Sequence, residues 1–413
     1  MKTLLGWAPQ IPNHWRVVPL NSVARMGTGH TPDRSNPDFW RLCNIPWVTI
    51  PDGARSANTL EPLIDTEQKV SALGVAGSSA KVHPAGTVML SRTASVGYTL
   101  RVGVAAATTQ DFVTWTCGPS LNSIYLLGVL RSMAPEWRRL AFGSTHRTIY
   151  MPDLDSIRIP LPPWSEQCKI ADAILSESCR AQKAEKSLSR LYSLASERVD
   201  AQILQLIGLA RLDRDDKDGV VPIKRVLQKV TRPVMNEGQV VTAFRDGQVT
   251  ARSMRATRGY TESASANPQG QGVRVADVVI HGLDGFAGAI GEAETDGNCS
   301  SVYHVCTAIG ENSGKFHARL LRILATNDYL PLFATSTRER AVDFRNWGLF
   351  GSIPIPGVAI RTQLEIAEQI SALAPLSALV SKSSYLLRER QRAFVTAAVT
   401  GQIDVSTAHG DES

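Results

Sequence analysis

The sequence lacks any run of about 18 consecutive apolar residues, and it has no CxxC pair. The first absence predicts that no helix spans a membrane, and the short, polar start of the chain does not resemble a signal peptide. The six cysteines show no fixed spacing with His, which argues against a structural zinc site. Reduced thiols and a cytoplasmic location are the expectation.

A third absence organises the chain: neither Gly nor Pro occurs from Ser165 to Leu206, although the sequence has 31 Gly and 22 Pro. Pro162-Pro163 end the preceding segment, and Ser165 suits a helix N-cap. Apolar residues recur at spacings of three and four, which predicts one long helix with a single apolar stripe. The stripe comprises Ile170, Ile174, Leu188, Leu191, Ala195, Val199, Ile203 and Leu206.

A second long helix is expected near the end of the chain, where Thr362 and Glu365 form a capping-box pattern. Because Pro375 lies inside the segment, and a proline in a helix interior costs about 3 kcal/mol, we expect two rods that meet near Ala374. Two core helices of one large domain are the simpler alternative. The seven-residue repeat favours a coiled-coil spacer and consists of Ile366, Leu373, Val380, Leu387 and Phe394.

The 413 residues suit two domains with connectors. We expect strands at 45–50, 87–90, 111–116 and 155–160, and a helix at 122–140, in the first globular part. In the second part we expect strands at 273–281 and 352–356 and a helix at 316–327. The predicted boundaries are 1–163 and 212–357 for the globular domains, 164–211 and 358–402 for the helices, and 403–413 for a loose tail.

The two halves resemble each other. The segment Asp155-Ser-Ile-Arg-Ile-Pro matches Gly351-Ser-Ile-Pro-Ile-Pro, and Gln167-Cys-Lys-Ile-Ala matches Gln363-Leu-Glu-Ile-Ala. We interpret this as a tandem repeat of a globule followed by a long helix. The predicted fold class is α+β: two mixed α/β domains in tandem, separated and joined by two antiparallel helices with pseudo-two-fold symmetry.

Four motifs in this order resemble specificity subunits of type I restriction–modification systems. They are Ile11-Pro-Asn-His-Trp15, Ile45-Pro-Trp-Val-Thr-Ile50, Leu161-Pro-Pro-Trp-Ser-Glu166 and the closing run from Arg390 to Asp404. Two features depart from the family pattern. Pro375 falls in the second spacer helix, and the second globule lacks the opening motif that contains Trp.

The resemblance implies a role in phage defence with two target-recognition domains, each reading one half of a bipartite, asymmetric DNA target. It implies that the helices set the spacer length and dock two methyltransferase subunits, with up to two ATP-dependent restriction subunits in the complex. It also implies that this chain has no catalytic activity and binds no cofactor. S-adenosylmethionine, ATP and magnesium are expected on the partner subunits.

Base reading requires polar side chains on loops that reach a groove of DNA. In the first globule we expect it from the loop after the strand ending at Leu90, from the residues before the strand at 111–116, and from the loop at 143–148. The alternative for each is a solvent-exposed loop without a ligand. The candidates are Arg92, Thr93, Ser95, Thr109, Gln110, Ser144, Thr145, His146 and Arg147.

Candidates in the second globule are polar residues beside its predicted strands, with several arginines suited to phosphate. Three further arginines recur at helical spacing, where a solvated helix face is equally expected. The formal charge of +6 permits a polyanionic partner without proving one. The candidates are His281, Asp284, Asn298, Arg338, Arg340, Arg345 and Asn346, and the helical arginines are Arg252, Arg255 and Arg258.

Two other functions stay open. Asp52 after Pro51, followed by Glu67 and Lys69, fits the PD…ExK pattern of nucleases, in which carboxylates hold magnesium. Pro-Asp also occurs at other positions, so the pattern has low specificity. A coiled-coil scaffold with two protein-binding globules would explain the helices and leave the family motifs unexplained.

Overall fold

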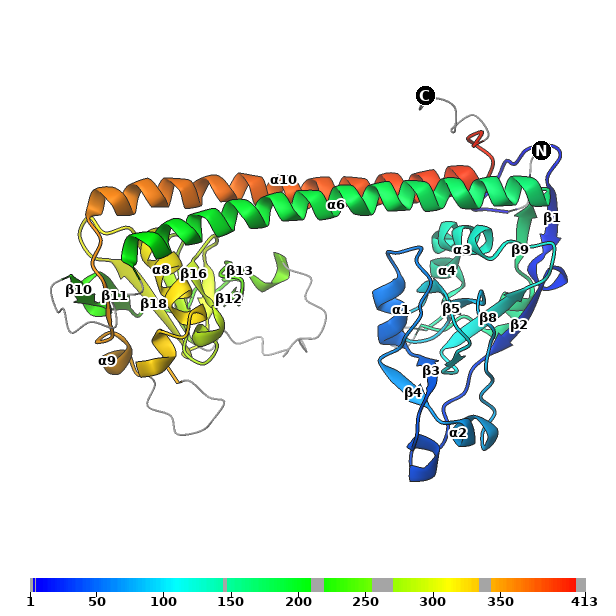
Figure 1. The fold of residues 1–413 in the computed structure, drawn as a ribbon, viewed down its shortest axis with the longest axis horizontal. Coiled ribbons are helices and arrows are strands. Elements are labelled where there is room, and N and C mark those ends of the chain that lie inside the picture. Colours follow the sequence, from blue (N-terminus) through cyan, green and yellow to red (C-terminus); the bar gives the residue numbers. More distant parts are fainter. Residues whose placement is uncertain are drawn as a thin grey trace. The chain divides into compact units, whose positions relative to one another are not determined.

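The computed structural model describes residues 3, 5–143, 147–208, 219–254, 270–333 and 343–405 (Figure 1). Its contacts divide the chain into two compact units. Unit 1 comprises residues 1–187 and 381–413, and unit 2 comprises 188–380. Each long helix therefore contributes one end to each unit, and the domain boundaries expected at the starts of the helices fall inside the units.

Unit 1 is built on a four-stranded sheet with the order β2-β8-β5-β6, accompanied by a three-stranded sheet β4-β3-β7 and the pair β1-β9. Its elements are β1 (Arg16–Pro19), η1 (Leu20–Ser22), β2 (Ala24–Thr28), η2 (Pro37–Trp40), β3 (Ile45–Val48), α1 (Ile50–Ser56), β4 (Gln68–Val70), α2 (Ala72–Ala76), β5 (Val88–Ser91), β6 (Thr99–Arg101), β7 (Ala107–Thr108), β8 (Phe112–Cys117), α3 (Ser123–Ser132), α4 (Ala134–Leu140), α5 (Met151–Asp155), β9 (Arg158–Leu161) and the start of α6 (Trp164–Ile207).

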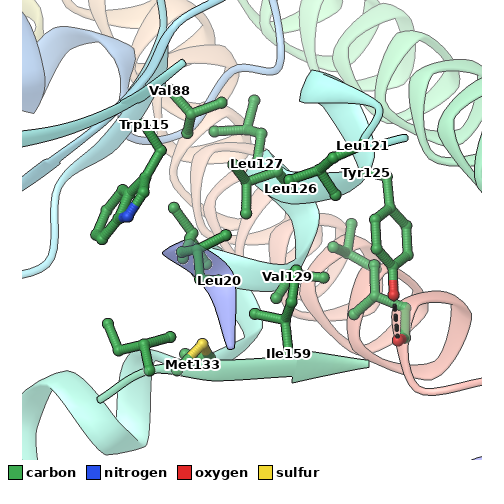
Figure 2. Close-up of a cluster of buried hydrophobic side chains, with 14 of the residues drawn as sticks. Leu20, Val88, Trp115, Leu121, Tyr125, Leu126, Leu127, Val129, Met133 and Ile159 are labelled. Carbon is green, nitrogen blue, oxygen red and sulfur yellow. Dashed lines mark hydrogen bonds between the residues drawn. The ribbon is translucent and has the colours of Figure 1, made fainter. Parts of the chain in front are cut away.

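The core of unit 1 lies between this sheet, α3 and the nearby ends of the two long helices. Figure 2 shows Trp115 and Val88 from the sheet beside Leu126 and Leu127 of α3. Tyr125 is fully buried, and its hydroxyl donates to the carbonyl of Pro160 at 2.8 Å. Burial of these side chains supplies the main stabilisation of the unit.

Unit 2 repeats the arrangement with a sheet in the order β11-β18-β15-β16, the pair β10-β19 and two further two-stranded sheets, β12-β13 and β14-β17. Its elements are β10 (Val220–Pro222), η3 (Ile223–Arg225), β11 (Leu227–Val230), β12 (Val241–Ala243), β13 (Val249–Ala251), η4 (Arg252–Met254), β14 (Gln271–Val273), β15 (Val278–His281), η5 (Gly285–Ala287), β16 (Ile290–Glu292), β17 (Gly297–Cys299), β18 (Tyr303–Ala308), α8 (Gly314–Thr326), η6 (Leu330–Phe333), α9 (Trp347–Phe350), β19 (Pro354–Pro356) and α10 (Ile360–Val399), which returns to unit 1.

The repeat in the sequence therefore has a structural basis. In each unit the strand pair that joins the beginning of the globule to its end, β1-β9 or β10-β19, leads directly into a long helix. The matching glutamines, Gln167 and Gln363, are both buried near the start of that helix. Each accepts a hydrogen bond from the main chain at the N-cap of the helix packed on the sheet, Asn122 for α3 at 2.9 Å and Ser313 for α8 at 3.0 Å.

Several element boundaries differ from the expectation. The helix expected at 122–140 is divided at Met133 into α3 and α4, because Pro135 suits the first turn of a new helix. The strand expected at 273–281 is divided by a turn at Ala276, whose φ is +69°. The strand expected at 45–50 ends at Val48, where Thr49 caps α1.

The first long helix, α6, has 44 residues. It starts at the predicted boundary of 164 and ends at Ile207, four residues before the predicted boundary of 211. Its N-cap was predicted wrongly, because Ser165 lies inside the helix and the carbonyl of Pro163 accepts from the amides of Glu166 and Gln167. The apolar stripe is also only partly correct. Leu191 and Leu206 are 60% and 45% exposed.

The second long helix, α10, runs unbroken for 40 residues, so the prediction of two rods is wrong. Pro375 and Ser371 are both exposed. Because Pro375 has no N–H, the Ser371 carbonyl lacks its helical hydrogen bond, and water can donate to it instead. The capping box is wrong as well, because α10 starts at Ile360 and Thr362 is already helical.

Among the described residues, α10 is the one helix long and apolar enough to cross a membrane, with an 18-residue window of mean hydropathy 1.2. It meets this condition by its length and composition only. The ends of α10 take part in folded cores: Ile366 and Leu373 pack in unit 2, and Val395 and Val399 pack in unit 1. These contacts are those of a helix in a globular protein.

Candidate nucleic-acid interface

Three loops of unit 1 meet where β5 ends and β8 begins. The main-chain N–H of Arg92 donates to the carbonyl of Asp111 at 2.7 Å, and the N–H of Ile149 donates to the carbonyl of Arg92 at 2.8 Å. We call the described parts of 91–97, 109–111 and 142–150 the first loop cluster. It brings together candidates separated by more than 50 positions in the sequence, Arg92 and Arg147 among them.

Side chains connect the same loops. Arg92 donates from Nε to the Gln110 carbonyl at 3.2 Å. The hydroxyls of Thr93 and Thr109 donate to the two oxygens of the Asp111 carboxylate, at 2.5 and 3.0 Å. Asp111 thus orients two of the predicted residues.

The first loop cluster also exposes an apolar side chain beside its polar ones. Thr148 bridges to both Thr93 and Phe142 in short antiparallel pairs, and Phe142 is 60% exposed. Arg147 is exposed next to Thr148, and Ser95 lies in the turn after β5. The candidates Ser144, Thr145 and His146 lie outside the described residues.

Thr31 joins this surface, although no sequence pattern indicated it. The Thr31 hydroxyl donates to the Gln110 side-chain oxygen at 2.8 Å. Nearby in the chain, the Arg34 guanidinium lies over the rings of Trp40 and Trp47, with 5.4 and 5.6 Å to their centroids. A basic residue six positions before a tryptophan is a weak signal, and only the fold places it against the aromatic rings.

Unit 2 presents a matching second loop cluster, formed by the described parts of 281–288, 300–302 and 343–346. The N–H of Gly282 donates to the Val302 carbonyl at 3.1 Å, and the N–H of Phe344 donates to the Gly282 carbonyl at 2.8 Å. These two bonds reproduce the pair that Arg92 makes in unit 1. The strands also correspond, since Ser91 pairs with Phe112 as His281 pairs with Tyr303.

His281 and Asp284 lie together in the second loop cluster. Arg245 donates to Oδ1 of Asp284 at 3.0 Å, and Nε2 of His281 lies 3.8 Å from Oδ2. The rings of His281 and Tyr303 make a T-shaped contact, with 4.5 Å between centroids. Burial lowers the pKa of His281, which Asp284 partly opposes, and burial raises the pKa of Tyr303 to about 12.

Arg345 and Asn346 flank the same loops. Arg345 makes a bidentate ion pair with Asp343, whose pKa its hydrogen bonds lower to about 2. Asn346 caps α9, because its side chain accepts from the N–H of Leu349 at 3.4 Å. Arg345 is exposed, but both residues already have partners: Arg345 pairs with Asp343 through Nε and Nη2, and Asn346 caps a helix.

Asn298 does not belong to this surface. It is 2% exposed, and its amide both accepts from the N–H of Met235 at 2.8 Å and donates to the Met235 carbonyl at 2.8 Å. It holds the loop before β12 in place, so we revise its assignment from DNA contact to structural residue. The remaining candidates Arg255, Arg258, Arg338 and Arg340 lie outside the described residues, while Arg252 lies next to His281 in a pocket.

The residues of the nuclease pattern do not form a metal site. Asp52 is fully buried, and its carboxylate accepts from Thr49, from Arg55 at 2.7 Å and from the N–H of Glu67 at 3.2 Å. Lys69 pairs with Asp65 at 3.1 Å. Within the described part of the chain, no group of three or more His, Cys, Asp or Glu side chains could hold a metal ion. Asp52 therefore acts as a helix-capping residue.

Comparison with known families agrees with this geometry. Residues 12–182 match the family model of the type I restriction modification DNA specificity domain. This range contains the first loop cluster and the start of α6. Residues 12–182 are thus similar to such a domain.

Two relatives are named specificity subunits. The chain is 26% identical over 167 residues to the type I restriction enzyme MjaIX specificity subunit of Methanocaldococcus jannaschii, covering 40% of this chain and 38% of the relative. It is 27% identical over 149 residues to the EcoprrI specificity subunit of Escherichia coli, covering 35% and 36%. Each match thus spans well under half of the relative's length.

The fold of the whole chain also has a solved counterpart. A chain from a structure described as the basis of complex assembly and conformational transition of the type I restriction–modification system superposes with a TM-score of 0.57 and 17% identity. The superposition covers 95% of this chain and 100% of that chain. At this identity the likeness concerns the fold.

Proposed function

We propose that this chain is the non-catalytic specificity subunit of a type I restriction–modification complex and that it acts on double-stranded DNA in the cytoplasm. Each unit reads one half of a bipartite target through its loop cluster. The side chains of the two clusters differ, so the two half-sites differ and the target is asymmetric. Arg92, Arg147, Arg252 and Arg345 are suited to phosphate and base edges.

One observation carries the proposal: the same two main-chain hydrogen bonds hold a polar loop cluster at the same strand ends in both units. The family model covers residues 12–182 only. The repeated strand order extends the interpretation to unit 2. Two equivalent sites with different side chains suit a reader of two different short sequences.

The helices α6 and α10 are proposed to set the distance between the half-sites and to dock two methyltransferase subunits. Exposed apolar side chains on both helices, such as Leu191 and Leu379, leave surface for such partners. Up to two ATP-dependent restriction subunits would complete the assembly. The partners would supply S-adenosylmethionine, ATP and magnesium, and no role for these groups is derived for this chain.

The other readings explain less. A nuclease that uses Asp52 would need a carboxylate open to a metal, and this one is buried and hydrogen-bonded. A coiled-coil scaffold would not account for the polar clusters at equivalent strand ends. Neither reading is favoured by a specific contact in the structure.

The test begins with the tagged chain purified from its own host together with its partners. We expect one copy with two methyltransferase subunits, and the complex should enrich a bipartite sequence from a randomised DNA pool. Replacing residues 212–357 with the globule of another specificity subunit should change one half-site and leave the other intact. A lone chain that cuts DNA with magnesium, or a complex that enriches no sequence, would contradict the proposal.

A further inference from the structure

A pocket in unit 2 lies where the loop after β15 meets the start of β18. Its polar lining consists of Thr242, Arg245, Arg252, His281, Asp284 and Tyr303. We call it the His281 pocket. Since it forms part of the second loop cluster, the argument below depends on the proposed function and specifies what that cluster reads.

The position of the proton on His281 follows from its hydrogen bonds. Its Nδ1 accepts from the main-chain N–H of Leu283 at 3.1 Å and from that of Asp284 at 2.9 Å. A nitrogen that accepts carries no hydrogen, so in the neutral ring Nε2 bears it. His281 therefore presents a single N–H donor, held in a fixed direction by the turn that follows β15.

Asp284 supplies an acceptor beside that donor. Arg245 donates to Oδ1 of the carboxylate at 3.0 Å. The positive charge of Arg245 thus compensates the negative charge of Asp284 near a polyanion. Oδ2 lies 3.8 Å from Nε2 of His281, too far for a direct hydrogen bond. Neither Oδ2 nor Nε2 has another hydrogen-bond partner among the described residues, and the Asp284 side chain is 40% exposed.

We infer that His281 and Asp284 together read the major-groove edge of an adenine in the second half-site. Nε2–H of His281 would donate to N7, and Oδ2 of Asp284 would accept from the N6 amino group. The pair offers one donor and one acceptor side by side, as an Asn or Gln amide does when it reads adenine.

The other bases fit less well. Guanine presents two acceptors, N7 and O6, so its O6 would face the carboxylate of Asp284. Cytosine can supply an amino group to Asp284 but leaves His281 without an acceptor on the same base, and thymine presents O4 and a methyl group. The carboxylate thus selects for an amino group, and the imidazole selects for a neighbouring acceptor.

Unit 1 has no such pair at the equivalent position. Ser91, which corresponds to His281, donates its hydroxyl to the Ser95 carbonyl at 2.5 Å. Both oxygens of Asp111 accept threonine hydroxyls. The adenine preference assigned to the His281 pocket therefore belongs to the second half-site alone.

The experiment uses the complete complex and randomised DNA, with wild type, His281→Ala, Asp284→Asn and the control Glu311→Gln. Glu311 is exposed in the turn after β18, at the far end of that strand from the pocket. We expect both pocket variants to lose preference at one and the same adenine position. Asp284→Asn should additionally admit guanine there, because an amide N–H can face O6. The control should match wild type.

Base analogues test the wild-type complex without any variant. At the identified position, 7-deazaadenine lacks N7 and purine lacks the 6-amino group. Each should weaken binding by roughly tenfold to a hundredfold. The 7-deazaadenine substitution should not weaken DNA binding by the His281→Ala variant any further. If wild type enriches no bipartite sequence, the proposed function fails. If wild type does enrich a bipartite sequence, two results would show that the inference about the His281 pocket is wrong. One is that the two variants do not change the preference at the same adenine position, and the other is that the analogues have no effect.

Discussion

Gln167 and Gln363 show how one side chain can hold a globule to its helix. Gln363 accepts from the N–H of Ser313 and donates to the carbonyl of Val358 at 2.8 Å and to the side chain of Asn312 at 3.2 Å. Gln167 makes the corresponding contacts with Asn122, Ser120 and Pro162 in unit 1. The match between the two halves was visible in the sequence, and these contacts supply its physical reason.

Gln363→Ala should lower the free energy of unfolding of unit 2 by about 1–3 kcal/mol, because it leaves buried main-chain groups without partners. The measurement is chemical denaturation followed by hydrogen exchange of peptides from unit 2. Gln369→Ala is the matched control, since Gln369 is exposed on the same helix. Equal stability of the two variants would contradict the assigned role.

Arg147→Ala should weaken DNA binding about equally across sequences and should reduce the slope of log K against log salt by about one. The reason is that Arg147 is exposed in the first loop cluster, where it suits a phosphate. Binding is measured by titration of the complex at several salt concentrations. Lys81→Ala, an exposed basic residue ahead of β5, should leave the slope unchanged. An altered base preference for Arg147→Ala would instead assign it to base reading.

The residues of the candidate site could be foreseen only in part. Arg92, Thr93 and Gln110 adjoin strand ends, and the ends of neighbouring strands bring their side chains together. Asn298 is also polar and also lies in a strand region, but the amide of its side chain is already hydrogen-bonded to Met235. Because Met235 lies 63 positions away, the sequence does not indicate this bond. Arg245 was missed because the turn at Asp246-Gly247 gives no sign that Asp284 is near.

At the scale of elements, the sequence predicted α6 better than α10. The absence of Gly and Pro defines α6 by a simple physical rule. For α10 the rule for proline was applied without knowing that Pro375 faces solvent, where the lost hydrogen bond can be replaced by water. Exposure is a property of packing, which the local sequence does not determine.

The two helices make direct contacts in unit 1 that support a pairing role. Arg388 forms an ion pair with Glu185, and Gln391 donates to the Ser178 hydroxyl at 2.8 Å. Arg390 pairs with Glu177, whose side chain is 9% exposed, at 3.1 Å. The segments run antiparallel, because residue numbers rise in α10 as they fall in α6.

Deleting two heptads from the Ala181–Ala195 region should change the preferred length of the DNA spacer and leave both half-sites unchanged. This expectation follows from the proposed role of the helices, because removing whole heptads preserves the face that packs. Sequencing of DNA enriched by the altered complex measures both quantities. Altered half-sites at the original spacer length would contradict the model.

At the scale of the whole molecule, four histidine side chains have a pKa that is lowered by burial. Burial is the main cause that lowers the pKa of His83, His281, His304 and His317. The unfolded chain, with an ordinary histidine pKa near 6.5, therefore binds more protons than the folded chain as pH falls below that value. Their contribution to stability is fully present above pH of about 6.5 and is lost on acidification.

The melting temperature should accordingly decrease as the pH is lowered from 7.5 to 5.5. Glu292 acts in the opposite direction, because burial raises the pKa of its carboxyl. His317→Gln should reduce the dependence on pH, whereas the non-titrating control Gln369→Ala, at an exposed position, should leave it as in wild type. A melting temperature that stays constant or rises on acidification would exclude this account.

The loop clusters are attached to their sheets through main-chain hydrogen bonds, such as those of Arg92 with Asp111 and of Gly282 with Val302. Main-chain groups are the same for every residue except proline. Side chains in these loops that make no such bonds, unlike those of Arg92 and Asp111, can thus be exchanged during evolution with little penalty to folding. Under the proposed function, selection can then explore new targets one substitution at a time while the scaffold stays constant.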